Sequence, residues 1–163
     1  MRRLLVLLGS VAALTGTAAT GQGPEVELVR IEKAARRMTL LDASRRVVRS
    51  YSGIQLGSNP LGAKHFAGDG RTPEGRYVID HGNDASAYHL SLHISYPAPA
   101  DRALAAASGR SAGGAIFIHG QPNSVHSGRI AGDWTTGCIA VSNQEIEEIW
   151  TLVPDGTPIE LIP

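Results

Sequence analysis

The stretch that most restricts the fold is residues 87–96, AYHLSLHISY, in which apolar and polar side chains alternate. Alternate side chains of an extended strand point to opposite faces of the sheet, so the apolar ones from Tyr88 to Tyr96 would share one face. The other face would carry His89 and His93. This pattern predicts a half-buried strand in a sheet with one polar, solvent-facing side.

The rest of the chain favours the same class of fold. Nineteen glycines, nine prolines and an aromatic content of 5% are typical of a turn-rich β protein rather than a helix bundle. One helix is expected at 98–108, and a capping box of Ser142 and Glu145 opens a second. We expect a mostly β (α+β) domain with one or two helices. Its other short strands are predicted at 26–31, 37–42, 47–54, 76–80, 114–120, 137–141 and 158–162, with an N-terminal hairpin from the first three.

The first residues have the composition of an export signal. Arg2 and Arg3 precede an apolar run over residues 4–14, and small residues follow it. We expect a signal peptide at 1–19, with an uncleaved anchor as the alternative, because the run is short for a transmembrane helix. The mature chain is then expected in the periplasm or cell envelope.

The charge balance restricts the partners. Lys plus Arg and Asp plus Glu number 15 each, so the formal net charge at pH 7 is zero. Binding to the phosphates of nucleic acid needs a basic excess, and we therefore expect no nucleic-acid partner.

The only cysteine, Cys138, has no partner for a disulfide in a chain expected to be exported. A lone thiol is either a small buried apolar group or a nucleophile, and a nucleophile needs a base. His119, at the end of an apolar strand, is the candidate base, with a structural histidine as the alternative. Gly137 could present its amide to an oxyanion, and Thr135 and Thr136 add hydroxyl donors.

Two motifs in order make the chain resemble a known family. The first is IHG at 118–120 followed by TTGCI at 135–139, with the histidine and cysteine 19 positions apart. The second is RTPEGRYVI at 71–79. Together they resemble the L,D-transpeptidase (YkuD-type) catalytic domain, in its small periplasmic murein branch. The resemblance implies a β-sandwich-like catalytic domain over 35–163, preceded by an extension with the first strand at 20–34.

The resemblance also implies a mechanism. Cys138 would attack the carbonyl of meso-diaminopimelate in a peptidoglycan stem peptide and form a thioester, with His119 as the base. The backbone carbonyl of Gly120 would orient the imidazole. The amides of Gly137 and Cys138, helped by Thr135, would line an oxyanion hole. The resemblance implies no metal and no organic cofactor.

Two positions depart from the pattern of many family members. Thr136 stands where many have histidine, and Ala140 stands where many have an arginine that supports the site. A contact with an anionic substrate must then come from another part of the chain. The candidates are Arg129, Arg71 and Lys64, each alternatively a solvated surface charge, with His93 and Trp134 as further residues that line the cleft.

Three other readings compete with a transpeptidase. A zinc hydrolase could use His89, His93 and His119, but positions i and i+4 of a strand lie about 13 Å apart, too far to share one ion. A non-catalytic wall-binding module is a second. A hydrolase that cuts the bond between peptidoglycan and an outer-membrane lipoprotein is the third, because the same residues serve it. In each case we expect a monomer.

Overall fold

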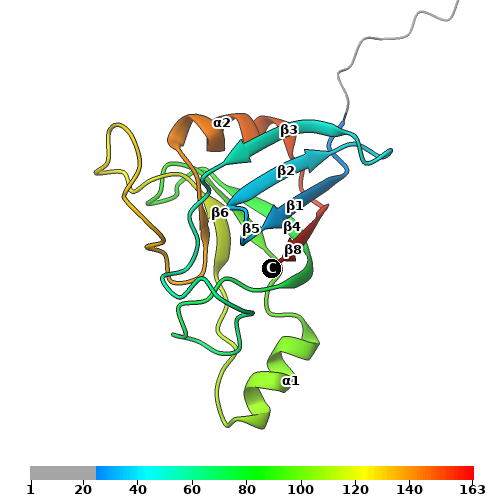
Figure 1. Ribbon diagram of the computed structural model, residues 1–163, viewed down its shortest axis with the longest axis vertical. Coiled ribbons are helices and arrows are strands. Elements are labelled where there is room, and N and C mark those ends of the chain that lie inside the picture. The colour runs from blue at the N-terminus through cyan, green and yellow to red at the C-terminus, as the bar shows by residue number, and fades with distance from the viewer. Residues whose placement is uncertain (1–24) are drawn as a thin grey trace, which may run out of the picture.

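The computed structural model describes residues 25–163 and contains one mostly β domain, as predicted (Figure 1). The expected signal peptide at 1–19 and the start of the extension at 20–34 lie outside the described residues. The strands are β1 (Leu28–Glu32), β2 (Arg37–Leu41), β3 (Val47–Ser52), β4 (Gly75–Asn83), β5 (Ser91–Ile94), β6 (Ile116–His119), β7 (Ile139–Ala140) and β8 (Thr157–Ile162).

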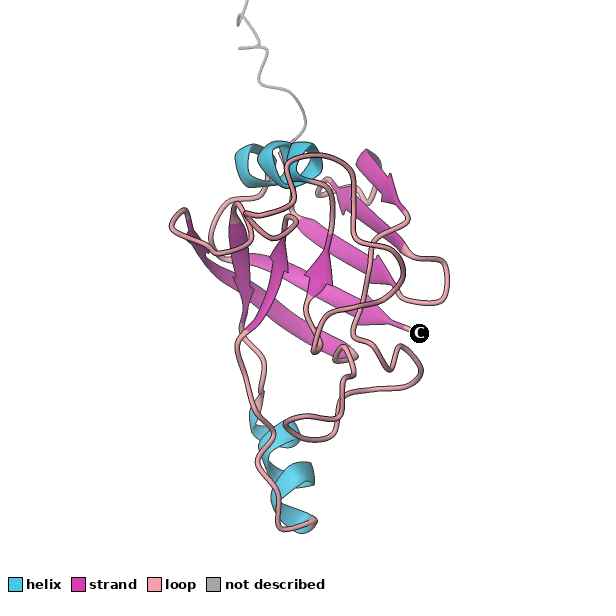
Figure 2. Cartoon of the chain, turned by 90° about the vertical axis from the view of Figure 1, so that its left-hand side faces the viewer, coloured by secondary structure: helices cyan, strands magenta, loops and turns pink. Residues whose placement is uncertain are grey.

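All eight of these strands form one sheet in the order β3-β2-β1-β8-β4-β5-β6-β7. The first three are antiparallel neighbours, which confirms the predicted N-terminal hairpin. The last strand, β8, lies at the centre of the sheet, parallel to β1 and antiparallel to β4. The sheet is strongly curled, so the strands run in clearly different directions at its two ends (Figure 2).

The two helices lie at opposite ends of the domain (Figures 1 and 2). Helix α2 (Asn143–Leu152) begins at the predicted capping box, in which the Ser142 hydroxyl accepts from the Glu145 amide. Its apolar face buries Ile146 and Ile149 completely. Helix α1 (Pro99–Ala107) projects from the sheet and buries only Ala105. No helix within residues 25–163 is long and apolar enough to cross a membrane.

The alternating stretch at 87–96 forms a shorter strand than predicted. Strand β5 covers only Ser91–Ile94, and the residues before it form a turn and a bend. The strand cannot begin earlier because His89 has a left-handed φ of 68°, and its amide donates to the side chain of Asn123. The apolar face is buried from Leu92 onward, but Tyr88 is 39% exposed and belongs to the turn.

Buried charges hold the long loop between β3 and β4. The Lys33 side chain is 2% exposed, and its ammonium donates to the carbonyls of Gly62 and Thr72 and to the carboxylate of Glu74. Farther along the loop, Lys64 and Asp69 form a second buried ion pair of 2.8 Å. These contacts place the RTPEG segment, which leads into β4, beside the cysteine loop described below.

Candidate active site

A cavity of about 490 Å³ opens at the end of β6 and the start of β7. His119 and Cys138 both line it. The sheet register explains this placement, because His119 is opposite Ala140 in the parallel pair of β6 and β7. Cys138 precedes Ala140 by two residues and therefore projects on the same face as His119. The other lining residues are Asn83, Ser86, Ala87, Tyr88, Ser91, Ala115, Phe117, Trp134, Thr135 and Thr136.

The imidazole of His119 is 4% exposed and held in one tautomer. Its Nδ1 lies 2.7 Å from the carbonyl oxygen of Gly120. A carbonyl only accepts, so Nδ1 carries the proton and Nε2 keeps its lone pair. Burial lowers the pKa of His119, and the Gly120 carbonyl opposes part of that shift. The side chain is therefore a neutral imidazole with a free basic nitrogen.

Close packing behind this histidine requires glycine at position 120. A Cβ there would lie 2.7 Å from Oδ1 of Asn143 and 3.0 Å from the carbonyl oxygen of Tyr88. That same Oδ1 accepts from the amide of Gln121, whose buried side chain donates to the carbonyl of Val141. The chain that leaves β6 is thus fixed to the start of α2, and the carbonyl that orients His119 is fixed with it.

Gly137 sets the position of the thiol. Its φ is 137°, which favours glycine, and a Cβ would lie 2.6 Å from the carbonyl oxygen of Arg71. The two sequence motifs therefore touch each other at this point. The Sγ of Cys138 lies 3.6 Å from the carbonyl oxygen of Ala115. Burial raises the pKa of the Cys138 thiol, although a backbone contact with Phe117 and the Lys64 charge lower it in part.

Thr135 shapes the loop that carries the cysteine. Its hydroxyl donates to the Cys138 carbonyl at 2.8 Å and accepts from the Gly137 amide at 3.1 Å. The Gly137 amide, expected to face an oxyanion, is therefore bonded to the Thr135 hydroxyl in this structure. Thr136 is exposed and lines the cavity.

Aromatic rings form one wall of the cavity. The Trp134 ring lies edge-on to His119 with a centroid distance of 5.7 Å. Tyr88 lies closer, 4.6 Å from His119, and 6.0 Å from Trp134. The sequence pattern placed Tyr88 on the apolar face of a strand, and no local signal indicated the left-handed residue that turns it over the histidine.

The basic candidates do not line the cavity. The ammonium of Lys64 is bonded to Asp69 and to the carbonyl of Phe66, and its side chain is 3% exposed. Arg129 binds Glu145 and the carbonyl of Gly53. Arg71 has its guanidinium 3.4 Å from the carbonyl of Ala63. His93 lies on the same face of the sheet as the cavity, beside Asp80. The structure thus brings Cys138, His119, Gly120, Gly137, Thr135, Thr136 and Trp134 together and leaves these four outside the cavity.

One curled sheet thus carries His119 at the end of β6 and Cys138 immediately before the neighbouring strand β7. The family model of the YkuD L,D-transpeptidase catalytic domain matches residues 27–161, and the chain belongs to this family. No curated protein gave a significant match.

Several solved structures are similar to this chain. The helical cell shape determining protein Pgp2 from Campylobacter jejuni is 26% identical with a TM-score of 0.67, over 85% of this chain and 48% of Pgp2. The L,D-transpeptidase from Xylanimonas cellulosilytica is 18% identical with a TM-score of 0.55, over 90% of this chain and 65% of the other. An L,D-transpeptidase from Mycobacterium smegmatis is 17% identical with a TM-score of 0.54, over 86% and 60%. The chain spans about half the length of Pgp2.

Proposed function

We propose that the protein is a cysteine-dependent peptidoglycan L,D-transpeptidase that acts at meso-diaminopimelate of stem peptides. The observation that carries this proposal is the arrangement of His119 and Cys138. Both line one cavity, and the Gly120 carbonyl leaves the basic Nε2 of His119 free. Family membership supports the reaction class.

The resting state favours general-base catalysis over a preformed ion pair. Burial raises the thiol pKa of Cys138 and lowers the imidazole pKa of His119, so both groups are neutral near pH 7. The Sγ proton passes to Nε2 as Sγ bonds to the carbonyl carbon of diaminopimelate. The C–N bond to D-alanine then breaks, and the leaving amine takes the proton from His119. The acceptor amine gives a proton to His119 as its nitrogen bonds to the thioester carbon, and His119 passes that proton to Sγ as the C–S bond breaks.

Donors for the oxyanion come from the loop that carries the nucleophile. The Cys138 amide is the first donor in this scheme, because it belongs to the same residue as the attacking sulfur. The Gly137 amide joins it only if its hydrogen bond with the Thr135 hydroxyl opens. Thr136, exposed at the cavity, supplies a hydroxyl from the same loop.

The cellular role follows from the substrate. Remodelling of peptidoglycan places the enzyme in the periplasm or cell envelope, which agrees with the expected signal peptide. The name of Pgp2 describes it as a determinant of helical cell shape, and we extend a role in wall architecture to this chain. The partners are peptidoglycan stem peptides, and the protein works as a monomer.

Purified protein incubated with muropeptides tests the proposal. New cross-links or D-amino-acid exchange are expected. The Cys138→Ala variant should lose all measurable turnover, and His119→Ala should lose about 10²–10⁴-fold. His126→Ala, in the exposed loop between IHG and TTGCI, is the matched control and should keep full activity. Circular dichroism checks that each variant is folded.

Three outcomes would contradict the proposal. Turnover by Cys138→Ala would exclude the thioester. A carbapenem should acylate the wild-type chain once, as seen by mass spectrometry, and an unmodified Cys138 in the folded protein would exclude a reactive thiol. Release of free lipoprotein from lipoprotein-linked muropeptides, without cross-links, would replace transfer by hydrolysis at the same site.

A further inference from the structure

We propose that Asp80, His81 and His93 form a binding site for one divalent transition-metal ion of the zinc type. The site lies on the face of the sheet that also carries the cavity, and it includes neither Cys138 nor His119. The inference rests on the side chains of β4 and β5 and is independent of the proposed reaction.

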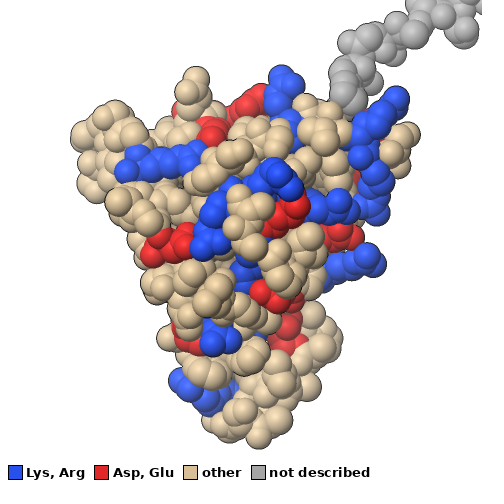
Figure 3. All heavy atoms as spheres, viewed as in Figure 1, with Lys and Arg blue, Asp and Glu red and all other residues tan. Residues whose placement is uncertain are grey.

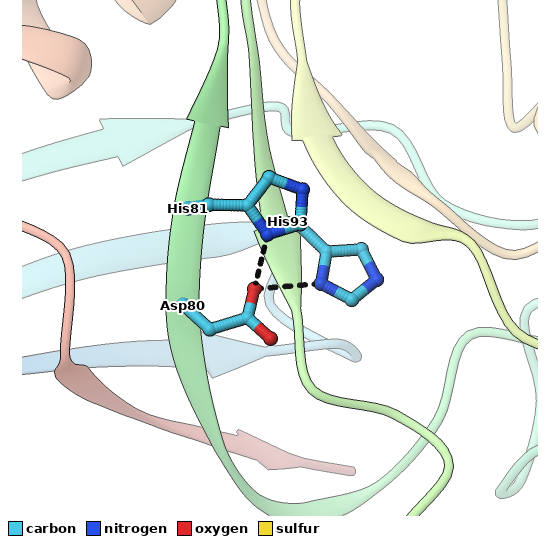
Figure 4. Close-up of side chains that lie close together, drawn as sticks. All are labelled: Asp80, His81 and His93. Carbon is cyan, nitrogen blue, oxygen red and sulfur yellow. Dashed lines mark hydrogen bonds and ion pairs between the residues drawn. The ribbon is translucent and has the colours of Figure 1, made fainter.

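A bulge in β4 creates the cluster. Ile79 pairs with Ile94, and His81 pairs with His93, so β4 has one residue more than β5 between these two pairs. That extra residue is Asp80. Consecutive residues of a regular strand point to opposite faces, but a bulge lets two neighbours project on one side. Asp80 and His81 therefore both lie against His93 from the adjacent strand (Figure 4).

The three side chains converge on one point. Oδ1 of Asp80 lies 2.7 Å from Nδ1 of His93 and 2.8 Å from Nδ1 of His81. The two imidazoles are stacked, with centroids 4.7 Å apart and planes 25° from parallel. One ligand atom from each residue lies within 4.8 Å of the others. Two ring nitrogens and one carboxylate oxygen thus face a common centre (Figure 4).

This donor set and spacing suit zinc. Ligands bound at about 2.0–2.2 Å in tetrahedral geometry lie about 3.4 Å from one another, so the nitrogens need to move from the carboxylate oxygen by less than about 1 Å. Each Nδ1 now donates a proton to the carboxylate. Metal binding through Nδ1 requires each ring to offer a lone pair there and to hold its proton on Nε2 instead, a tautomer that exchange with solvent provides. Three protein ligands leave a fourth position for water.

The proposed metal site is open to solvent and lies close to the cavity. The side chains of Asp80 and His81 are 42% and 56% exposed, and that of His93 is 20% exposed. The next row of the same face, two residues along each strand, consists of Asn83, Ser91 and His119, all of which line the cavity. An ion here would lie about 7 Å along the strands from that row.

The proposed site uses His81 and His93, whereas the zinc-hydrolase alternative in the sequence analysis used His89, His93 and His119. His89 lies outside β5, where its Nε2 is 2.7 Å from the carboxylate of Glu147. His119 is bonded to the Gly120 carbonyl. His93 instead meets His81, its partner on the adjacent strand β4. On its other side, His93 packs edge-on against Phe117 of the cavity wall, with a centroid distance of 4.9 Å.

Titration of the untagged full chain with zinc chloride tests the site by calorimetry, and cobalt(II) absorption in the visible range reports the ligand geometry. One equivalent should bind, and zinc should raise the melting temperature because the ion bridges β4 and β5. His81→Gln and His93→Gln should each weaken binding by at least about tenfold, since even the loss of an outer-shell partner has an effect of that size. His89→Gln is the matched control and should bind as the wild type does.

Cys138→Ala separates this site from the reactive thiol and should retain the binding. Loss of binding in Cys138→Ala, with unchanged binding in His81→Gln and His93→Gln, would overturn the proposal. The absence of saturable binding to wild-type protein at millimolar zinc would overturn it as well. Neither result would bear on turnover of muropeptides, which tests the proposed function separately.

Discussion

The two ends of the sheet are held together by different interactions. The hairpin end consists of β1, β2 and β3, and the cleft end consists of β5, β6 and β7 with the loops around the cavity. In the hairpin end, β1 and β2 bury Val29, Ile31, Met38 and Leu40 completely, and ion pairs such as Arg37–Glu32 and Arg49–Glu148 lie at the surface. Basic and acidic side chains are interspersed over the visible surface (Figure 3). In the cleft end, polar groups such as His119, Gln121 and Thr135 are buried and bonded to backbone atoms of neighbouring loops. Apolar burial tolerates exchange of similar side chains, whereas directional contacts depend on particular atoms. The cleft end should therefore be far more sensitive to single substitutions.

The largest effect is expected for Gly137→Ala. The new Cβ would meet the Arg71 carbonyl, and the φ of 137° disfavours any residue with a side chain. A shift of about 1 Å in the nucleophile is enough to reduce turnover by about 100-fold. Carbapenem acylation and muropeptide turnover measure the loss.

Gly128→Ala is the control for this prediction. Gly128 also has a positive φ, 76°, but a Cβ there meets nothing within 4 Å. It should lose some stability and keep its activity. Equal activity of the two variants would show that the contact between Gly137 and Arg71 does not position the thiol.

The second prediction concerns the buried pair that holds the loop beside the cysteine. Burial alone would raise the pKa of Asp69, but the Lys64 ammonium and the amides of His65, Arg71 and Phe66 lower it to about 2. Asp69→Asn leaves the Lys64 charge buried without its partner, and the free energy of unfolding should fall by about 3 kcal/mol. Urea denaturation measures this change.

Asp155→Asn, in an exposed turn, is the matched control and should change stability by less than about 0.5 kcal/mol. The contribution of Asp69 has a defined pH range. Its pKa is lower in the folded than in the unfolded chain, so the stabilisation is present above about pH 4 and is lost as the pH falls towards 2. If the difference in the free energy of unfolding between wild type and Asp69→Asn did not change with pH, it would contradict the ion pair.

The third prediction is a pH profile of acylation by a carbapenem. Since burial lowers the pKa of His119, the acid limb should lie below the ordinary histidine value of about 6.5, with about a tenfold loss for each pH unit beneath it. The rate should stay level between pH 7 and about 8, because the thiol pKa is raised. A bell-shaped profile that declines above neutral pH would instead indicate a thiolate–imidazolium pair.

The smallest effect is expected at the hairpin end. Arg49 and Glu148 form an ion pair at the surface, with side chains that are 56% and 41% exposed. Arg49→Ala should lower the free energy of unfolding by about 0.5 kcal/mol or less. A double-mutant cycle with Glu148→Gln isolates the pair. A coupling above about 2 kcal/mol would remove the distinction between the two ends of the sheet.

Local patterns in the sequence predict the regular part of the molecule. The hairpin, the capping box of α2 and the burial of Ile146 and Ile149 follow from periodicity and cap chemistry, and the structure confirms them. The strand at 87–96 was predicted too long because alternation continues through His89, while the backbone there turns to satisfy a contact with Asn123. No local rule anticipates a bond to a residue 34 positions away.

The candidate active site was likewise predicted only in part. The spacing of motifs pointed to His119 and Cys138, and both line the cavity. Tyr88 and the Asp80 cluster were missed, because a turn and a bulge decide their orientation. Charge alone suggested Lys64 and Arg129 as substrate contacts. Their carboxylate partners, Asp69 and Glu145, are brought to them by the fold.

The central place of β8 has a consequence for how the chain folds. Among the named strands, the hairpin end joins the cleft end through β8 at residues 157–162, which pairs with β1 on one side and with β4 on the other. An isolated bridge between Gln55 and Ala140 adds a second backbone link. Val29 and Ile159 are partners across 130 positions, so this contact closes a very long loop. During synthesis, the strand pairing between the two ends of the sheet therefore waits until residues 157–162 have emerged, and the rate-limiting step of folding should be the insertion of β8.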